Sequence, residues 1–554
     1  MFSLRNPRIR SAIATLTVAV LVAVGTVTAT AGRTPAMAPA AFTSSVEDEG
    51  ADCPVTLPGS TTSNSQLPDP FTRLDGSRVS TVADWRCRRE EILRLAEKYV
   101  YGTKPAKPAS VTGSVTSSAV TVSVTDNGKT AGFSATVTLP SGTGPFPAVV
   151  VYGGMGVDTS TILSSGVAVI NYNEYAVGAE GTARNNKQGA FYTLYGSSSS
   201  TGLLMAWAWG VSRIIDVVSQ SGGGILKAGA MGVSGCSRFG KGAFVAGVFD
   251  QRIALTMPVE SGTAGVPILR GVNAEGAQSL SSAYSEQPWL GDAFGSYTGN
   301  PAALPVDTHE MVGMVAPRGL FIMDNPHIVN LGPKSGSVAA LGGAEVYKAL
   351  GAGANVSYWS DVQSGTHCSI RPEWTAPLQQ NLKKYLLGTG NDPGVFRISP
   401  SAQGNLAQWR TWTTPVLTGG PSTSPTSTTP TTPSTPPSTS PSTPPSTTPS
   451  TTPSTPPPTG CSAAVSVNQW SGGFTASVNV TAGAAPIGGW TVTMALPPGA
   501  AVTNTWNATA GGSGSVRFTN VGYNGSLGAG QTTNFGFQGT GTGQGMTVSS
   551  CAAS

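Results

Sequence analysis

The feature that most constrains this chain is a segment built only from Gly, Pro, Ser and Thr, residues 418–460. Such a segment has nothing to bury, and its prolines favour a disordered but extended and semi-rigid linker. The 554 residues are therefore predicted to form two units, a large one over residues 53–412 and a small one over 461–554. At about 3.1 Å per residue the linker spans on the order of 100 Å, which suits two units that act on one large object.

The N-terminus has the pattern of an export signal. Three arginines within residues 5–10 precede an apolar run over residues 12–27, which is followed by Ala29-Thr30-Ala31. A basic start, a short apolar run and a small-x-small exit are typical of a secretory signal peptide. We predict removal of residues 1–31, with cleavage as late as residue 41 as an alternative, and a secreted, extracellular protein with no membrane attachment.

The composition limits the possible partners. Charged residues are 10% of the chain, where an average soluble protein has roughly 25%, and three positive charges of the formal +4 lie in the predicted signal. A near-neutral surface excludes nucleic-acid binding through a basic face and suits an uncharged or nearly uncharged partner. We expect a monomer.

The six cysteines agree with export, because an oxidising compartment permits disulfides. Six cysteines allow 15 pairings, and the predicted domain boundaries favour three of them. No CxxC pair supports a zinc site, so no metal is expected. The favoured pairs are Cys53 with Cys87, Cys236 with Cys368, and Cys461 with Cys551.

The large unit is predicted to be α/β. Helical patterns run over residues 85–99 and 202–219. Apolar, β-branched runs alternate with helical stretches, which indicates a mostly parallel sheet with helices on both faces. The predicted strands are residues 119–125, 133–139, 148–152, 166–171, 228–233, 253–259, 320–323 and 356–359.

A candidate nucleophile follows the fifth of these strands. Ser237 lies in Gly235-Cys236-Ser237-Arg238-Phe239-Gly240, just before a run of small residues with helical character. A sharp strand-to-helix turn lifts a serine hydroxyl above the sheet and directs backbone N–H groups at an oxyanion. The spacing is G-x-S-x-x-G, longer than the usual motif, so a plain turn stays open, as does Ser234 as the nucleophile.

The scarcity of histidine narrows the choice of base, because the chain has only His309, His327 and His367. Cys236 precedes Ser237, and Cys368 follows His367. The Cα atoms of a disulfide lie within about 7 Å of each other, so a Cys236–Cys368 bond would bring Ser237 and His367 close together. A purely structural disulfide remains the alternative.

The large unit resembles the glucuronoyl esterases, carbohydrate esterase family 15, in several motifs that occur in order. The resemblance implies an α/β-hydrolase fold, a three-layer sandwich, with a Ser-His-Glu triad and no cofactor. It also implies cleavage of esters between 4-O-methyl-glucuronic acid of glucuronoxylan and lignin alcohols. The motifs are Gly235 to Ala243, Val259-Glu260-Ser261-Gly262, Gln287-Pro288-Trp289, Asn330-Leu331-Gly332-Pro333 and His367-Cys368.

The resemblance assigns the catalytic roles: Ser237 is the nucleophile, His367 the base and Glu260 the acid, which would hold the imidazole tautomer. Spacing alone leaves Asp292, Asp307, Asp324 and Asp361 open as the acid, and Asp324 is the main alternative because it ends a strand.

The resemblance also implies substrate-binding residues. Arg238 matches the family's oxyanion-stabilising arginine, with an ordinary surface arginine as the alternative. Lys241, Gln278 and Glu286 match residues that bind the sugar hydroxyls of the uronate. Trp289 matches a family tryptophan, although core packing is an equal alternative. Asn330 stands where fungal members have a stacking tryptophan, so the chain departs from the family pattern at the polysaccharide-facing part of the cleft.

The small unit is predicted to be an all-β sandwich closed by the Cys461–Cys551 pair. It has one charged side chain, Arg517, and many short Thr/Val/Ser runs separated by Gly and Asn. It resembles a family 2 carbohydrate-binding module in Asn468 to Phe474, Gly489 to Val492, Trp506-Asn507-Ala508 and Tyr523 to Leu527. The resemblance implies stacking of Trp470, Trp506 and Tyr523 on cellulose, while Trp490 is expected in the core.

These observations predict a secreted glucuronoyl esterase that is held on plant cell walls by a cellulose-binding module. Another wall esterase, acting on acetyl xylan or feruloyl esters, is the first alternative. A wall-binding protein with no catalytic activity is the second.

Overall fold

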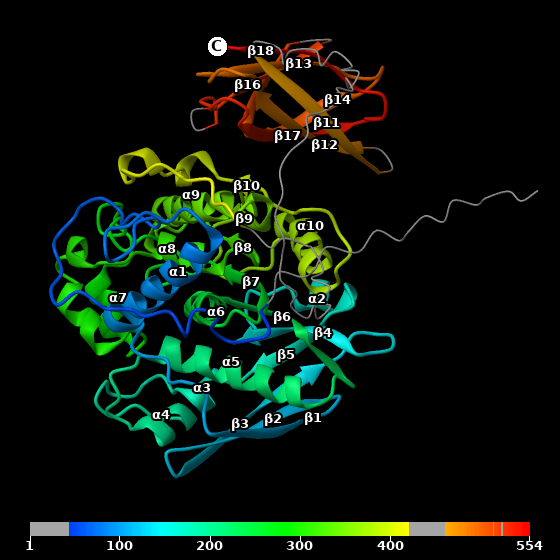
Figure 1. Cartoon of the computed structure of the whole chain (residues 1–554). Coiled ribbons are helices and arrows are strands. Elements are labelled where there is room, and N and C mark those ends of the chain that lie inside the picture. The colour runs from blue at the N-terminus through cyan, green and yellow to red at the C-terminus, as the bar shows by residue number, and fades with distance from the viewer. Residues whose placement is uncertain (1–43, 420–459, 471–472, 513–514, 522–523) are drawn as a thin grey trace, which may run out of the picture. The chain divides into compact units, whose positions relative to one another are not determined.

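The computed structural model describes residues 44–419, 460–470, 473–512, 515–521 and 524–554 (Figure 1). The predicted signal peptide and nearly all of the predicted linker lie outside these residues. Thr418, at the start of the predicted linker, forms a bridge with Thr81, and its carbonyl accepts the Val82 N–H at 3.0 Å. Among the described residues, no helix has the length and apolar character needed to cross a membrane.

A ten-stranded sheet forms the centre of the large unit, in the order β1-β2-β3-β5-β4-β6-β7-β8-β9-β10. The pairs β1–β2, β2–β3 and β3–β5 are antiparallel, which the sequence did not predict. The other six pairs are parallel, so the prediction of a mostly parallel sheet is confirmed. The strands are β1 (Ser110–Val115), β2 (Ala119–Asp126), β3 (Lys129–Thr138), β4 (Phe146–Tyr152), β5 (Ala168–Tyr172), β6 (Leu226–Cys236), β7 (Ile253–Val259), β8 (Gly319–Met323), β9 (Val356–Trp359) and β10 (Phe396–Arg397).

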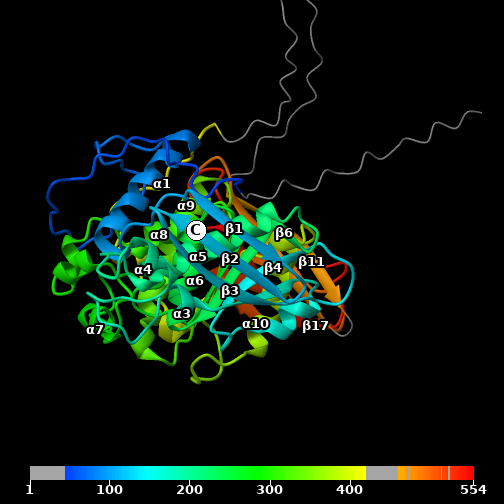
Figure 2. The ribbon, with the colours of Figure 1, turned by 90° about the horizontal axis from the view of Figure 1, so that it is seen from below.

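The burial of each strand follows from its place in the sheet. Every residue of β4 and β7 is buried, as expected of parallel strands covered on both faces. Strand β3 instead alternates between buried and exposed residues over its second half. Figure 2 shows β1, β2 and β3 side by side at the antiparallel end of the sheet.

Helices cover both faces of the sheet, so the prediction of an α/β fold is confirmed. Along β4, Ala148 and Val150 pack into one core with α1, α5, α6, α8 and α9, whereas Val149 and Val151 pack into a second core with α2 and α10 (Figure 1). The helices are α1 (Val82–Ala96), α2 (Thr159–Ser164), α3 (Glu174–Val177), α4 (Ala190–Tyr195), α5 (Leu203–Gln220), α6 (Arg238–Phe249), α7 (Leu280–Glu286), α8 (Thr308–Val315), α9 (Pro333–Ala349) and α10 (Pro372–Asn381).

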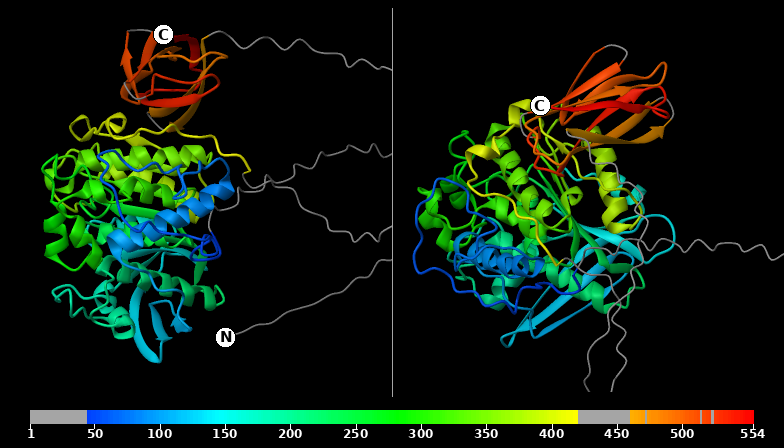
Figure 3. Two further views of the ribbon diagram at one scale, coloured as in Figure 1. Left: turned by 60° about the vertical axis from the view of Figure 1, so that its left-hand side comes forward. Right: turned by 45° about the horizontal axis from the view of Figure 1, so that its top comes forward.

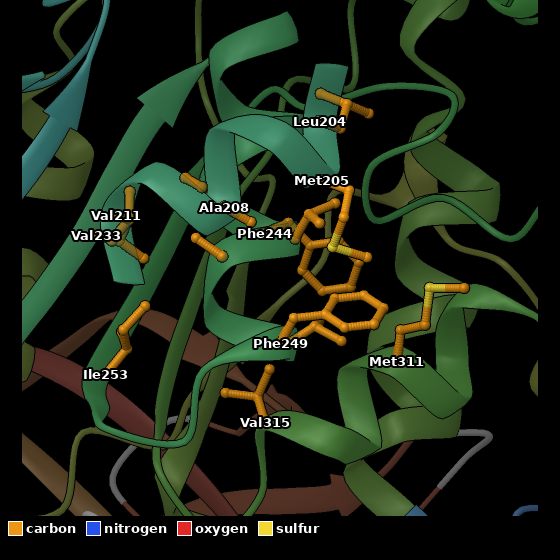
Figure 4. Close-up of a cluster of buried hydrophobic side chains, with 14 of the residues drawn as sticks. Leu204, Met205, Ala208, Val211, Val233, Phe244, Phe249, Ile253, Met311 and Val315 are labelled. Carbon is orange, nitrogen blue, oxygen red and sulfur yellow. The ribbon is translucent and has the colours of Figure 1, made fainter. Parts of the chain in front are cut away.

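The core around α6 fixes the helix that begins at the candidate nucleophile. Figure 4 shows Met205 of α5, Phe244 and Phe249 of α6, and Met311 and Val315 of α8 gathered in one cluster. All five side chains are almost fully buried. Each contributes roughly 1.5–3 kcal/mol through removal of its apolar surface from water, so α6 is held along its length.

The small unit consists of two four-stranded antiparallel sheets, β11-β12-β17-β14 and β15-β16-β13-β18, and the predicted sandwich is confirmed (Figure 3). The sheets face each other, because Trp490 of β13 lies 5.2 Å from Phe535 of β17 between ring centroids. Trp490 is fully buried and its Nε1 donates to the Asn524 carbonyl, as expected of a core residue. The strands are β11 (Cys461–Trp470), β12 (Gly473–Ala482), β13 (Trp490–Ala495), β14 (Ala501–Trp506), β15 (Ala508–Gly511), β16 (Ser515–Asn520), β17 (Thr532–Thr540) and β18 (Thr547–Ala553).

Candidate active site

Ser237 occupies the turn between β6 and α6. Its backbone has φ 61° and ψ −128°, a conformation that few residues other than glycine adopt and that costs on the order of 1–3 kcal/mol. Two glycines make the turn possible, since a Cβ on Gly235 would lie 2.5 Å from the Phe239 carbonyl oxygen and one on Gly240 2.5 Å from that of Val259. The sequence thus builds the strand–turn–helix that exposes a serine hydroxyl. Ser234, in contrast, is buried within β6, and its hydroxyl donates to the Met257 carbonyl.

A disulfide joins this turn to the loop that carries His367. Cys236 and Cys368 are bonded, with their Cα atoms 5.8 Å apart, as the sequence predicted. Gly156, in the loop after β4, packs against the bond, and a Cβ on it would lie 2.7 Å from the Cys236 Cβ. Ser237 and His367 are each the immediate neighbour of one bonded cysteine. The other two pairs, Cys53–Cys87 and Cys461–Cys551, are also formed.

Glu260 holds the imidazole of His367. It follows β7 with a φ of 43°, it is fully buried, and its Oε2 lies 2.6 Å from His367 Nδ1. Because a carboxylate only accepts hydrogen bonds, the proton of the neutral imidazole is held on Nδ1, and Nε2 is left as the basic nitrogen. The His367 side chain is 39% exposed, so this nitrogen can be reached by a substrate.

Three further donors surround the same carboxylate. The Cys368 N–H donates to Oε2 at 2.8 Å, while Arg371 Nη2 and Asn325 Nδ2 donate to Oε1 at 3.0 and 3.2 Å. Burial by itself would raise the pKa of Glu260, but the hydrogen bonds from His367, Cys368 and Arg371 outweigh burial and lower this pKa. Glu260 is therefore an ionised, fixed acceptor.

Asp324, the main alternative acid, is engaged elsewhere. It follows β8, and its carboxylate accepts hydrogen bonds from the Tyr358 hydroxyl and the Asn325 N–H, both at 2.9 Å. Burial raises the pKa of Asp324 to about 7. Its partners are a tyrosine of β9 and the backbone of the next residue, whereas the carboxylate bonded to His367 is that of Glu260.

Arg238 begins α6 directly after Ser237. Its side chain is 40% exposed, and its Nη1 lies 3.5 Å from the Glu180 Oε2. The first N–H groups of a helix have no partner within the helix, and α6 begins at the serine turn. A guanidinium and these N–H groups are suited to stabilising an oxyanion formed at Ser237.

Lys241 lies one turn further along α6, and its N–H donates to the Ser237 carbonyl at 3.0 Å. Its ammonium group is buried, donates to the Ser261 carbonyl at 2.6 Å, and lies 5.6 Å from the centre of the Trp289 ring. Burial lowers the pKa of Lys241 to about 8, although the charge of Glu286 opposes this change. Because this amine is already buried, it loses little further hydration when it binds a polar ligand.

Gln278 and Glu286 complete the predicted substrate-binding set. Gln278 Nε2 donates to Glu286 Oε2 at 2.7 Å, at the end of α7. Trp289 is almost fully buried, and its Nε1 donates to Glu180 Oε1 at 2.6 Å. The structure thus brings Lys241, Gln278, Glu286 and Trp289 into one neighbourhood.

The comparisons with known proteins agree with this geometry. Residues 122–351 match the sequence model of a family described as "Glucuronyl esterase, fungi". The 4-O-methyl-glucuronoyl methylesterase of Hypocrea jecorina is 39% identical over 376 residues, which are 66% of this chain and 80% of that protein. The protein of the same name from Schizophyllum commune is 37% identical over 392 residues, 69% of this chain and 98% of that protein. The chain belongs to the glucuronoyl esterase family.

Solved structures of glucuronoyl esterases have the same fold, so the predicted α/β-hydrolase architecture is confirmed. The catalytic domain from Hypocrea jecorina has a TM-score of 0.61 and 38% identity, and it covers 65% of this chain and 100% of its own. A serine-to-alanine mutant from Sporotrichum thermophile, in complex with methyl 4-O-methyl-beta-D-glucopyranuronate, has a TM-score of 0.62 and 36% identity, covering 66% and 99%.

The C-terminal unit has a separate match, because residues 461–554 fit the sequence model described as "Cellulose binding domain". Of the three aromatic residues expected to stack on cellulose, Tyr523 and the side chains of Trp470 and Trp506 lie outside the described residues.

Asn330, where the resemblance implies a tryptophan in fungal members, lies next to Gln278. It lies in the short turn Val329–Leu331, and its carbonyl accepts the Gln278 N–H at 3.0 Å. The position therefore adjoins the predicted substrate-binding set.

Sequence reasoning missed three residues that contact the site: Glu180, Asn325 and Arg371. Glu180 and Asn325 lie in loops far from their partners in sequence, and no local pattern marks them. Arg371 is four residues after His367, which is the one signal that pointed to it.

The donor atoms of Cys236, Glu260, His367 and Cys368 lie within 4.8 Å of one another. Both sulfurs are consumed in the disulfide, so they do not offer thiolates to a metal ion.

The other two histidines have structural partners. His309 is buried, with Nε2 2.9 Å from the Pro68 carbonyl oxygen, and His327 Nε2 lies 2.8 Å from the Val362 carbonyl oxygen.

Proposed function

We propose that the chain is a secreted glucuronoyl esterase that hydrolyses esters of (4-O-methyl-)glucuronic acid in glucuronoxylan with lignin alcohols. Family membership and the hydrogen bond between Glu260 and His367, next to the disulfide that leads to Ser237, support this reaction. The relative from Sporotrichum thermophile binds a methyl ester of the same sugar acid, which supports the acyl side of the substrate.

In the proposed first step, Ser237 Oγ attacks the ester carbonyl carbon while His367 Nε2 accepts the hydroxyl proton. The carbonyl oxygen becomes an oxyanion beside the N-terminus of α6, where the Arg238 guanidinium and backbone N–H groups stabilise it. Glu260 stays ionised and stabilises the imidazolium. His367 then gives the proton to the oxygen of the alcohol, which leaves, and an acyl-enzyme ester on Ser237 remains.

In the second step a water attacks the acyl-enzyme. His367 Nε2 accepts a proton from this water, a second oxyanion forms at the same place, and its collapse returns the proton to Ser237 Oγ. The products are the free uronic acid and the active serine. No step requires a cofactor.

We propose that Lys241, Gln278 and Glu286 bind the uronate ring, with the buried Trp289 indole packed behind the Lys241 ammonium. An ammonium, an amide and a carboxylate supply both donors and acceptors for sugar hydroxyls. An acetyl esterase has no sugar on the acyl side and needs no such set. This argument favours glucuronoyl esters over acetyl xylan or feruloyl esters.

We further propose that the C-terminal unit binds cellulose through Trp470, Trp506 and Tyr523 and so holds the esterase on plant cell walls. The match to a cellulose binding domain and the near absence of charge in this unit support this role. The export pattern at the N-terminus and the three disulfides support secretion.

Hydrolysis of the methyl and benzyl esters of glucuronic acid by the wild type and Ser237→Ala tests the proposal. We expect turnover of both esters by the wild type and loss of turnover in Ser237→Ala, with adsorption to cellulose unchanged. Turnover of acetyl xylan but not of glucuronate esters would instead identify a different wall esterase. Cellulose binding by an inactive wild type would leave the wall-binding alternative.

A further inference from the structure

Glu180 is a carboxylate that two hydrogen-bond donors and one guanidinium contact. It lies in the loop between α3 and α4, and its side chain is 13% exposed. Trp289 Nε1 donates to Oε1 at 2.6 Å, and the Tyr175 hydroxyl donates to Oε2 at 3.0 Å. Arg238 Nη1 lies 3.5 Å from the same Oε2. One side chain therefore contacts both the residue after Ser237 and the indole behind Lys241.

The chemistry of these partners requires an acceptor with two free oxygens. An indole N–H only donates, and a guanidinium keeps its charge at every pH at which proteins are folded. Burial and the charge of Glu180 raise the pKa of Tyr175 to about 12, so its hydroxyl also stays a donor. A carboxylate accepts hydrogen bonds from the indole and the hydroxyl and also pairs with the guanidinium by charge.

The loop that carries Glu180 is fastened to the segment that carries Trp289. The Gly181 N–H donates to Gln287 Oε1 at 2.7 Å, and Arg184 Nη1 donates to the Leu290 carbonyl at 2.6 Å. The Glu180 carboxylate is thus held in place independently of Arg238. A fixed carboxylate can define where an exposed guanidinium lies, whereas the guanidinium alone has many rotamers.

The negative charge of Glu180 itself works against catalysis, because it weakens the positive field of Arg238 at the oxyanion. Any gain in rate that Glu180 provides must then come from the positions in which it holds Arg238 and Trp289. A misplacement of about 1 Å in a catalytic group costs on the order of a hundredfold in rate.

We propose that Glu180 is a positioning residue that fixes the Arg238 guanidinium beside Ser237 and the Trp289 indole beside Lys241 through one carboxylate. This inference rests on the proposed function. It adds a residue that links Arg238, next to the expected oxyanion, to Trp289, next to the Lys241 that is expected to bind the sugar. It acts through Arg238 and Trp289 and does not touch the substrate.

Glu180→Gln tests the inference, because an amide has one acceptor oxygen and turns an NH₂ group toward at least one of the donors. We expect kcat on methyl glucuronate to fall about tenfold or more. Glu345→Gln is the matched control: Glu345 is 20% exposed, pairs with Arg410 at 3.1 Å, and accepts a hydroxyl hydrogen bond from Thr414. The control should keep wild-type kcat. An unchanged or raised kcat in Glu180→Gln overturns the inference.

A double-mutant cycle separates positioning from general stability. If Glu180 acts through Arg238, then Glu180→Gln in an Arg238→Ala background should lower kcat by about threefold or less. An equal loss in both backgrounds overturns the inference.

Glu180→Asp retains a two-oxygen acceptor and should have a kcat above that of Glu180→Gln; a kcat no higher overturns the inference. The wild type is measured first. If it does not hydrolyse glucuronate esters, the proposed function is contradicted. If it does, but substitution of Glu180 leaves kcat unchanged, this inference alone is contradicted.

Discussion

Removal of the Cys236–Cys368 disulfide should damage both stability and catalysis. The two cysteines are 132 residues apart in sequence. The chain-entropy relation for a loop of this length gives a loss of about 5 kcal/mol from the free energy of unfolding. Because the bond also joins the turn of Ser237 to the loop of His367, we expect the Cys236→Ala/Cys368→Ala enzyme to lose kcat by on the order of a hundredfold.

The Cys53–Cys87 disulfide is the natural control, because it lies in the same unit with a sequence separation of 34. Its removal should cost about 4 kcal/mol by the same relation but should leave kcat near the wild-type value. Denaturant unfolding followed by tryptophan fluorescence measures the stability of both variants, and hydrolysis of methyl glucuronate under native conditions measures kcat. If the Cys236→Ala/Cys368→Ala enzyme loses stability but keeps kcat, the bond is only a structural link and the reasoning is refuted.

The remaining predictions concern four single side chains. Glu260→Gln should lower kcat on the order of a thousandfold or more, since the amide no longer enforces the imidazole tautomer. The pKa of Glu260 is also lowered on folding. The wild type should therefore lose more stability than this variant as the pH falls below 4.5. Lys241→Met should raise KM for methyl glucuronate about tenfold, the value of one charged hydrogen bond. Because the pKa of Lys241 falls from 10.5 to about 8 on folding, the wild type should gain stability between pH 8 and 10.5, and the variant should not; equal pH profiles would contradict the burial argument. Trp506→Ala should lower retention on cellulose with turnover of a soluble ester unchanged, whereas Trp490→Ala should destabilise the small unit by about 3–5 kcal/mol because it empties the core.

The sequence predicted the buried parallel strands well and the rest of the fold less completely. Strand β7 has the bounds predicted for residues 253–259, because a strand covered on both faces is a continuous apolar run. Strand β1 was missed, since an edge strand of Ser, Val, Thr and Gly carries little apolar signal. Helix α9 was also missed, because its Gly-, Ser- and Ala-rich sequence is buried on most sides and has no clear apolar stripe.

Catalytic residues could be predicted from the sequence where they adjoin residues that form a covalent bond with each other. Ser237 and His367 adjoin two cysteines, and a disulfide is a distance restraint that the sequence displays. Glu180 could not be found in this way, since its hydrogen bond to Trp289 spans 109 residues and depends on how two loops pack. The choice between Glu260 and Asp324 likewise needed the positions of the ends of β7 and β8.

The most direct test of the account is covalent labelling of the native enzyme with a fluorophosphonate, an electrophile that reacts with activated serine hydroxyls. Peptide mass spectrometry should find a single phosphonylated residue, Ser237, and the labelling rate should collapse in His367→Ala. Labelling of Ser234 or of another serine, or labelling of Ser237 at an unchanged rate without His367, would contradict the claim that these two residues form the catalytic pair.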